Sequence, residues 1–132
     1  MPIQHKVDLE IGILHVERWG HINTHDEERA CRERSIDPLV TPGIPVLVDC
    51  TKVEPTDSVE TVRYIADCVT KNASTIKCGP VAIIVSSDVE YGMARMYMAY
   101  TELAQPITEV FRDQESALAW LIEERRKTIS AS

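Results

Sequence analysis

The sequence predicts an α/β fold: a mainly parallel five-stranded sheet with an antiparallel hairpin at one edge and four helices. Three observations support this prediction. Two short runs, residues 46–50 and 81–85, are almost entirely apolar, which is typical of strands covered on both faces of a parallel sheet. Segments with apolar residues at helical spacing alternate with these runs. Two extended runs near the amino terminus predict the hairpin, so the expected order is ββαβαβαβα.

The hairpin is predicted over residues 4–9 and 12–19, with Gly12 at or near its turn and Gly20 after its second strand. The second run alternates with the period of two that a strand requires. One face of this strand carries Ile13, His15, Glu17 and Trp19, and the other face carries Leu14, Val16 and Arg18.

The first helix is predicted from Thr24 to about Ser35, opening with a capping box that pairs Thr24 with Glu27. Most of its residues are charged, and only Ala30 and Cys31 are available to a core. We therefore expect a helix with a thin apolar face.

The later elements follow the same reasoning. Asp57, Ser87 and Asp113 can each cap a helix, and residues 107–112 form the last strand. The final helix is expected to end near residue 127. The expected core faces are Val59, Val62, Ala66, Val69 and Ala73 in the second helix, Val89, Met93, Met96, Tyr100 and Leu103 in the third, and Ala117, Leu118, Leu121 and Ile122 in the fourth.

The composition is that of a globular protein. The 132 residues are 44% hydrophobic and carry a formal charge of −7. They fit a single domain over residues 1–132, with a core at about 4–122 and a polar end at 123–132. The acidic surface argues against binding to nucleic acid or anionic lipid. No apolar run is long enough to span a membrane and no leader opens the chain, so a cytoplasmic location is expected.

The cysteines and histidines form no metal motif. His21 and His25 have i,i+4 spacing, but the predicted helix start falls between them. No C-x-x-C pair occurs among the four cysteines, which are Cys31, Cys50, Cys68 and Cys78. We expect reduced thiols, no metal and no cofactor, with a disulfide between Cys68 and Cys78 as the alternative.

Polar residues gather at the predicted carboxyl edge of the sheet, where parallel sheets usually bind ligands. Asp49 ends an apolar strand and needs hydrogen-bond partners, which Thr51 can supply. The candidate ligand or partner site consists of Asp49, Ser86, Ser87, Tyr91, Arg95 and Arg112. No catalytic spacing, phosphate loop or nucleophile elbow is present, so no enzyme is predicted. The alternative interpretation is a polar rim that satisfies loop backbone.

Several segments of the chain resemble one known family. They are the hairpin, residues 46–49, 81–88 and 92–96, and the ending Phe111-Arg112-Asp113 with residues 117–121. They resemble the SpoIIAA-like family of small STAS-related proteins over roughly residues 4–122. The resemblance implies a SpoIIAA-like βα superhelix, an architecture shared with lipid-binding CRAL-TRIO domains. Most members have no assigned activity, so the resemblance implies a fold rather than a function.

The same resemblance indicates a degenerate phosphorylation motif. STAS antagonists are phosphorylated on Ser or Thr at a helix start, in a motif of the form Asp-Ser-Ser/Thr-Gly. The matching stretch begins with Asp57 and Ser58, but Val59 stands where the phosphorylated hydroxyl is usual and Glu60 replaces Gly. We expect Ser58 to be a first-turn helix residue and not an obligatory phosphosite.

Three function classes follow. The first is a non-catalytic regulatory or protein-interaction module of STAS-like type. The second is a protein that binds a small apolar ligand or lipid, because the third helix has a surplus of Tyr and Met. The third is an enzyme of unknown reaction.

A homodimer is also expected from the apolar inner strands. Both of their faces must be hidden, and the charged first helix is the expected cover of the second face. Its apolar side is small, so a second chain or a bound apolar molecule is expected to complete the cover. Ile13 and Trp19 are the residues expected near the contact with a second chain.

Overall fold

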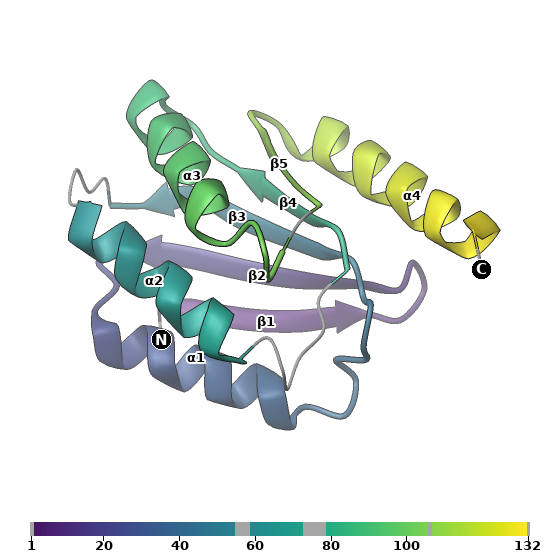
Figure 1. Cartoon of the computed structure of the whole chain (residues 1–132), viewed down its shortest axis with the longest axis horizontal. Coiled ribbons are helices and arrows are strands. Elements are labelled where there is room, and N and C mark those ends of the chain that lie inside the picture. The colour runs from purple at the N-terminus through teal and green to yellow at the C-terminus, as the bar shows by residue number, and fades with distance from the viewer. Residues whose placement is uncertain (1, 55–58, 73–78, 106, 132) are drawn as a thin grey trace.

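Strands and helices follow one another in the predicted order (Figure 1). The computed structural model describes residues 2–54, 59–72, 79–105 and 107–131. Its elements are β1 (Ile3–Asp8), β2 (Ile13–Gly20), α1 (Thr24–Ile36), β3 (Val46–Val53), α2 (Val59–Asn72), β4 (Val81–Ile84), α3 (Asp88–Tyr100), β5 (Thr108–Phe111) and α4 (Gln114–Ala131). Both β3 and α4 continue further than their sequence patterns predict.

The sheet has the strand order β1-β2-β3-β4-β5. β1 is antiparallel to β2, and each later strand is parallel to its neighbour. Gly12, in the hairpin turn, has a φ of 68°, a left-handed conformation that glycine adopts without steric cost. Its N–H donates to the carbonyl oxygen of Asp8 at 2.8 Å. The mainly parallel sheet with an antiparallel edge hairpin is therefore confirmed.

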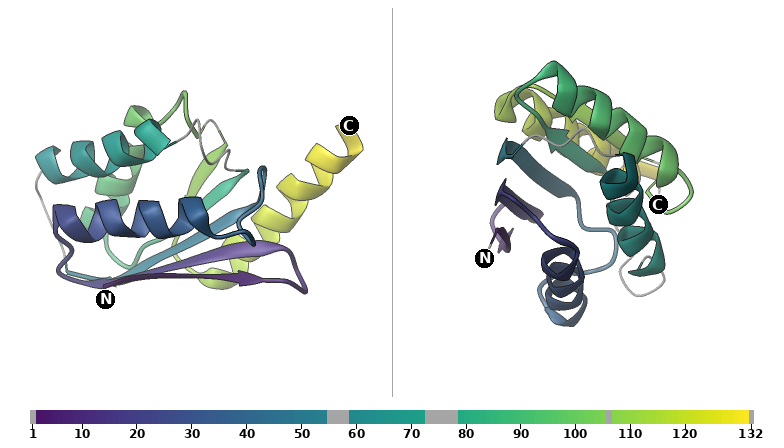
Figure 2. Two further views of the ribbon diagram at one scale, coloured as in Figure 1. Left: turned by 90° about the horizontal axis from the view of Figure 1, so that it is seen from below. Right: turned by 90° about the vertical axis from the view of Figure 1, so that its left-hand side faces the viewer.

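Helices α1, α2 and α3 lie on one face of the sheet, and α4 lies on the other (Figure 2). Each of the first three connects two neighbouring parallel strands, and the strand order advances in one direction. Right-handed crossovers then place all three helices on the same face. The expectation that α1 covers the second face is wrong for this reason, since the connection from β2 to β3 must lie beside the other two crossovers.

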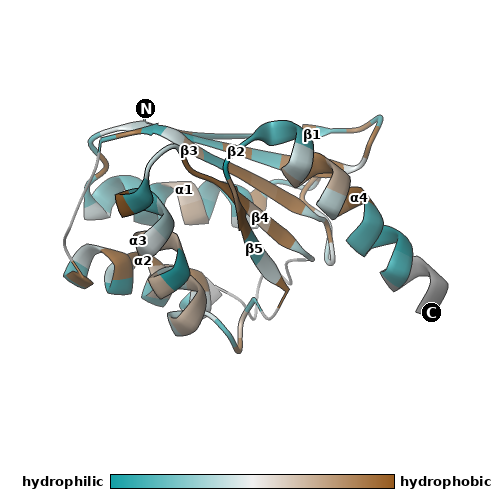
Figure 3. Cartoon of the chain, turned by 90° about the horizontal axis from the view of Figure 1, so that it is seen from above, coloured by the Kyte–Doolittle hydropathy of each residue, from teal (hydrophilic) through white to brown (hydrophobic). Residues whose placement is uncertain are grey.

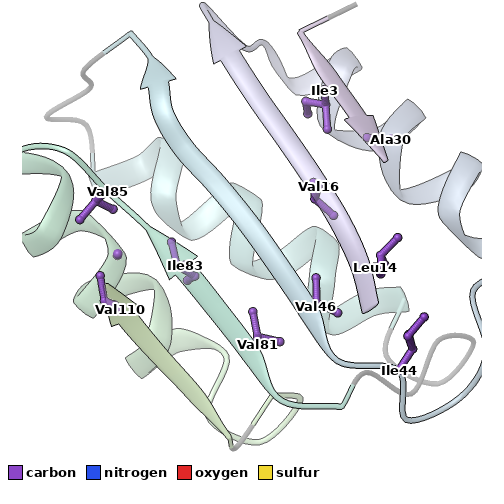
Figure 4. Close-up of a cluster of buried hydrophobic side chains, with 11 residues drawn as sticks. Ile3, Leu14, Val16, Ala30, Ile44, Val46, Val81, Ile83, Val85 and Val110 are labelled. Carbon is purple, nitrogen blue, oxygen red and sulfur yellow. The ribbon is translucent and has the colours of Figure 1, made fainter. Parts of the chain in front are cut away.

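The two faces of the sheet carry separate apolar cores, and strands β3 and β4 are strongly hydrophobic (Figure 3). On the three-helix face, alternate residues of the strands form the larger core (Figure 4), which includes Leu14, Val16, Val46, Val81, Ile83 and Val110. Under α4, the core consists of Ile13, Leu47, Ala82, Ile84, Ala117 and Leu121. Ile13 is thus covered by the chain's own last helix, and the argument for a second chain on that face loses its premise.

The first helix starts one residue earlier than predicted. Its N-cap is Asn23, whose Oδ1 accepts from the N–H of Asp26 at 2.8 Å, and Asp26 Oδ2 accepts from the N–H of Asn23 at 3.1 Å. The capping box predicted for Thr24 and Glu27 is therefore wrong. Asn is as good a cap as Ser and better than Thr, and its use leaves Glu27 free to point into the protein.

The third helix buries a different side from the one predicted. Val89 and Tyr100 are 53% and 40% exposed, whereas Ala94 is buried and Tyr97 packs against the core. Leu103, also expected in the core, lies beyond the end of the helix and is 99% exposed. Apolar side chains occupy most of the helix circumference, so helical spacing alone does not define its inner side. The N-cap is the predicted Ser87, whose Oγ accepts from the N–H of Glu90 at 3.1 Å.

Candidate functional site

The three-helix layer leaves a cavity above the middle of the sheet, and elementary geometry explains why. Neighbouring strands are about 4.8 Å apart, but packed helices need about 8–10 Å between their axes. Three crossovers over adjacent strand pairs therefore cannot all lie flat on the sheet. α1 moves out over β1, α3 moves out over β5, and α2 packs mainly on these two helices rather than on the strands (Figure 2).

The cavity beneath α2 has a volume of about 210 Å³ and a mainly apolar lining. Its walls include Val16, Val48 and Ile83 from the sheet and Val62, Ile65 and Met93 from the helices. An apolar cavity of about 150 Å³ is enough to bind benzene in an engineered protein. This cavity can therefore hold a small apolar molecule without rearrangement of the fold.

A buried ion pair joins the sheet to α1 at one end of the cavity. The guanidinium of Arg18 donates to both carboxylate oxygens of Glu27, with Nη1 3.3 Å from Oε2 and Nη2 in contact with Oε1. The two side chains are only 11% and 4% exposed. Burial acts to lower the pKa of Arg18, but the charge and hydrogen bonds of Glu27 outweigh it, so the pKa lies above its ordinary value. Arg18 is thus a fixed cation whose charge is already neutralised.

Two thiols line the same cavity. Cys31 on α1 is buried, and Cys50 on β3 is half-buried. Burial raises the pKa of Cys31, and it raises the pKa of Cys50 to about 11 because a thiolate is poorly solvated there. Both thiols are therefore protonated at neutral pH and act as part of the apolar wall.

Cys50 is expected to resist alkylation by iodoacetamide at pH 8 in the folded protein. With its pKa near 11 rather than 9, the reactive thiolate fraction falls roughly 100-fold, and the reagent must also reach the cavity. Peptide mapping by mass spectrometry after timed alkylation measures this, with the urea-unfolded chain as the control. Equal labelling rates of Cys50 in the folded and unfolded chain would contradict the prediction.

The six residues predicted at the carboxyl edge have different hydrogen-bond and ion-pair partners. Arg112 bonds Asp88 at 2.7 Å, and its guanidinium lies 5.1 Å from the centre of the Tyr91 ring. Beside them, Ser87 caps α3 and Ser86 Oγ lies 3.2 Å from Glu90 Oε1. The structure therefore brings four of the six residues together around the start of α3.

The other two residues, Asp49 and Arg95, have partners of their own. Asp49 is linked to the group through its partner Thr51, whose carbonyl oxygen accepts from Ser86 Oγ at 3.4 Å. Asp49 Oδ1 accepts from the N–H of Thr51 at 2.9 Å and from its hydroxyl at 2.6 Å, as the sequence predicts. Arg95 lies 3.8 Å from Glu109 on β5. Only the Ser87 cap satisfies a helix-end N–H among the six, as in the polar-rim interpretation, whereas Asp49 and Thr51 bond each other within β3. Asp57 and Ser58 lie outside the described residues.

The sequence does not predict the location of the cavity beneath α2 or its charged residues. A signal was present, because Arg18 lies in the same alternating set as the buried Leu14 and Val16, which places a charge on an inner face. A buried cation requires a partner from the element that packs on it, here Glu27.

Among the described residues, no cluster of three or more potential metal ligands occurs. None of the described helices is long and apolar enough to cross a membrane.

Comparison with known proteins identifies the fold and the family. No curated protein matches the chain in sequence. A crystal structure of an uncharacterized protein of the DUF3478 family from Shewanella loihica PV-4, which has a SpoIIAA-like fold, is similar with a TM-score of 0.62 and 22% identity. The match covers 90% of this chain and 91% of that chain, and it confirms the SpoIIAA-like fold. The model of a domain of unknown function, DUF7793, matches residues 8–125. The chain therefore belongs to the DUF7793 family.

Proposed function

We propose that the protein is a non-catalytic binding protein that holds a small apolar ligand in the cavity beneath α2. The observation that carries this proposal is the cavity of about 210 Å³, lined by valines, isoleucines and protonated thiols. Apolar cavities of this size gain free energy when they are filled, at about 25 cal/mol per Å² of apolar surface removed from water.

The regulatory or protein-interaction module expected first from the sequence is a second proposal. Its support is the fold, and a fold can carry many unrelated functions. Ligand binding ranks above it because the cavity gives it a specific location. An enzyme ranks below both, since the side chains at the carboxyl edge bond one another and Arg18 is held by Glu27.

A series of neutral 1-alkanols is expected to bind with affinity that rises with chain length and then stops rising. Each methylene that enters the cavity contributes about 0.8 kcal/mol, or roughly a fourfold gain in affinity, until the cavity is full. Isothermal titration calorimetry of the purified full chain, from hexanol to dodecanol, measures this. Absence of saturable binding across the series would overturn the proposed function.

A matched pair of variants locates the binding site. Ala94→Phe adds a ring at a cavity wall, whereas Ala99→Phe adds the same ring to an exposed position of the same helix. The first variant is expected to weaken alkanol binding at least tenfold, and the second is expected to leave it unchanged. Val62→Phe fills the cavity from α2 and replaces Ala94→Phe if that variant does not fold. Unchanged binding in the folded, filled variant would place the ligand elsewhere.

A further inference from the structure

The two ends of the cavity differ in charge. Glu54 and Glu90 line it near the carboxyl ends of the strands, at the same end as the ion pair of Arg18 with Glu27. Acidic side chains therefore outnumber cations there. α1 runs opposite to the parallel strands, so Arg34 in its last turn lies near their amino ends. At that end, the polar groups that line the cavity among the described residues include Arg34, the neutral Gln105 and the hydroxyl of Tyr97, which donates to Gln105 Oε1 at 2.9 Å.

The guanidinium of Arg34 is poorly satisfied. Its Nη2 donates to the sulfur of Cys31 at 3.5 Å, a weak acceptor, and its Nη1 is buried with no hydrogen-bond partner. The nearby acids of the same helix are engaged elsewhere, since Glu27 holds Arg18 and Glu33 lies 3.8 Å from Arg29. A buried donor without an acceptor destabilises the protein, and an incoming acceptor would remove that penalty.

We propose that the ligand is a single-chain carboxylate whose headgroup pairs with Arg34 and whose apolar chain fills the cavity. This inference rests on the proposed function and adds the chemical class of the ligand. The planar fork of arginine matches a carboxylate through two parallel hydrogen bonds. Arg34 is the one lining cation in the described residues that no carboxylate holds, so a monoanion balances its charge. The acids at the opposite end fix the orientation of the ligand by repelling its headgroup.

Decanoate and 1-decanol, which share a chain length, test this inference in the full chain. In Arg34→Met, the affinity for decanoate is expected to fall about 10- to 100-fold, while the affinity for decanol stays within twofold. Arg34→Lys, which keeps the charge, is expected to recover part of the decanoate affinity. Arg32→Met removes an exposed arginine of the same helix and is expected to change neither affinity.

The outcomes separate this inference from the proposed function. If decanol binds and Arg34→Met leaves both affinities unchanged, or lowers both equally, the carboxylate assignment is overturned while the cavity remains a binding site. If decanol does not bind the unmodified protein at all, the proposed function fails first. Circular dichroism of each variant confirms that the fold is retained before affinities are compared.

Discussion

Glu27→Gln is expected to lower the free energy of unfolding by about 3–5 kcal/mol. The substitution removes the negative charge from a buried pair and leaves the guanidinium of Arg18 uncompensated, which is the costly way to break such a pair. The pair also joins β2 to α1, a helix that otherwise buries only Ala30 and Cys31. Urea denaturation followed by circular dichroism measures the change as a lower midpoint with an unchanged slope.

Two controls distinguish lost charge pairing from general sensitivity of the helix. Glu28→Gln alters the neighbouring, exposed carboxylate, which accepts a 2.6 Å bond from Tyr64 that glutamine can keep, so its cost is expected to be below about 1 kcal/mol. The double variant Arg18→Met with Glu27→Leu replaces the pair by apolar groups and is expected to recover most of the loss. If Glu27→Gln and Glu28→Gln lowered the free energy of unfolding equally, the ion pair would not have the stabilising role given to it.

The architecture could be predicted from the sequence because its strongest signals are local. Residues 46–48 and 81–85 are apolar on successive positions, which only a sheet covered on both faces accommodates. Gly12 marks the hairpin turn, and Asp113 Oδ1 accepts from the N–H of Ser116 at 2.8 Å at the start of α4. Each of these signals depends on neighbours within a few residues, and each one was interpreted correctly.

The parts that could not be predicted depend on tertiary geometry. The inner side of α3 is set by its crossover, and a helix with apolar side chains around most of its circumference gives no local indication of it. Helical spacing alone therefore predicts a core position for Tyr100, which is 40% exposed. The cavity arises because helices are wider than strands, a consequence of strand order that no motif encodes. The pairing of Arg18 with Glu27 likewise appears only once α1 is placed on the sheet.

The candidate site was only partly anticipated. The surplus of Tyr and Met in the third helix led to the expectation of a ligand pocket, and Met93 and Tyr97 do line the cavity. The residues chosen for the site were instead those of the carboxyl edge, because ligand sites of parallel sheets usually occur there. In this fold the apolar volume lies beneath the middle helix, between the two ends of the strands.

Leu121→Ala is expected to destabilise the protein by about 2–5 kcal/mol, and Ile122→Ala by about 1 kcal/mol or less. Leu121 of α4 is fully buried in one core with Leu47 and Ile84 of the sheet, whereas Ile122 is 44% exposed although it also belongs to the predicted core face. The two substitutions remove apolar side chains of similar size from adjacent positions of one helix. The difference between their losses in the free energy of unfolding therefore measures how much α4 stabilises the protein by packing on the second face of the sheet. Thermal and urea unfolding of both variants at the same protein concentration give the comparison.

The same pair of variants tests whether α4 covers the second face alone. If a second copy of the chain packed on the outer side of α4, Ile122 would be buried in the contact. Ile122→Ala would then cost about as much as Leu121→Ala, and its cost would grow at higher protein concentration, because association stabilises the folded state by mass action. If α4 alone covers this face, Ile122→Ala lowers the free energy of unfolding only slightly, and the loss does not depend on protein concentration. Sedimentation equilibrium then gives the same mass for both variants. A concentration-dependent cost at Ile122 would overturn this account, since the second face would then be shared between two chains.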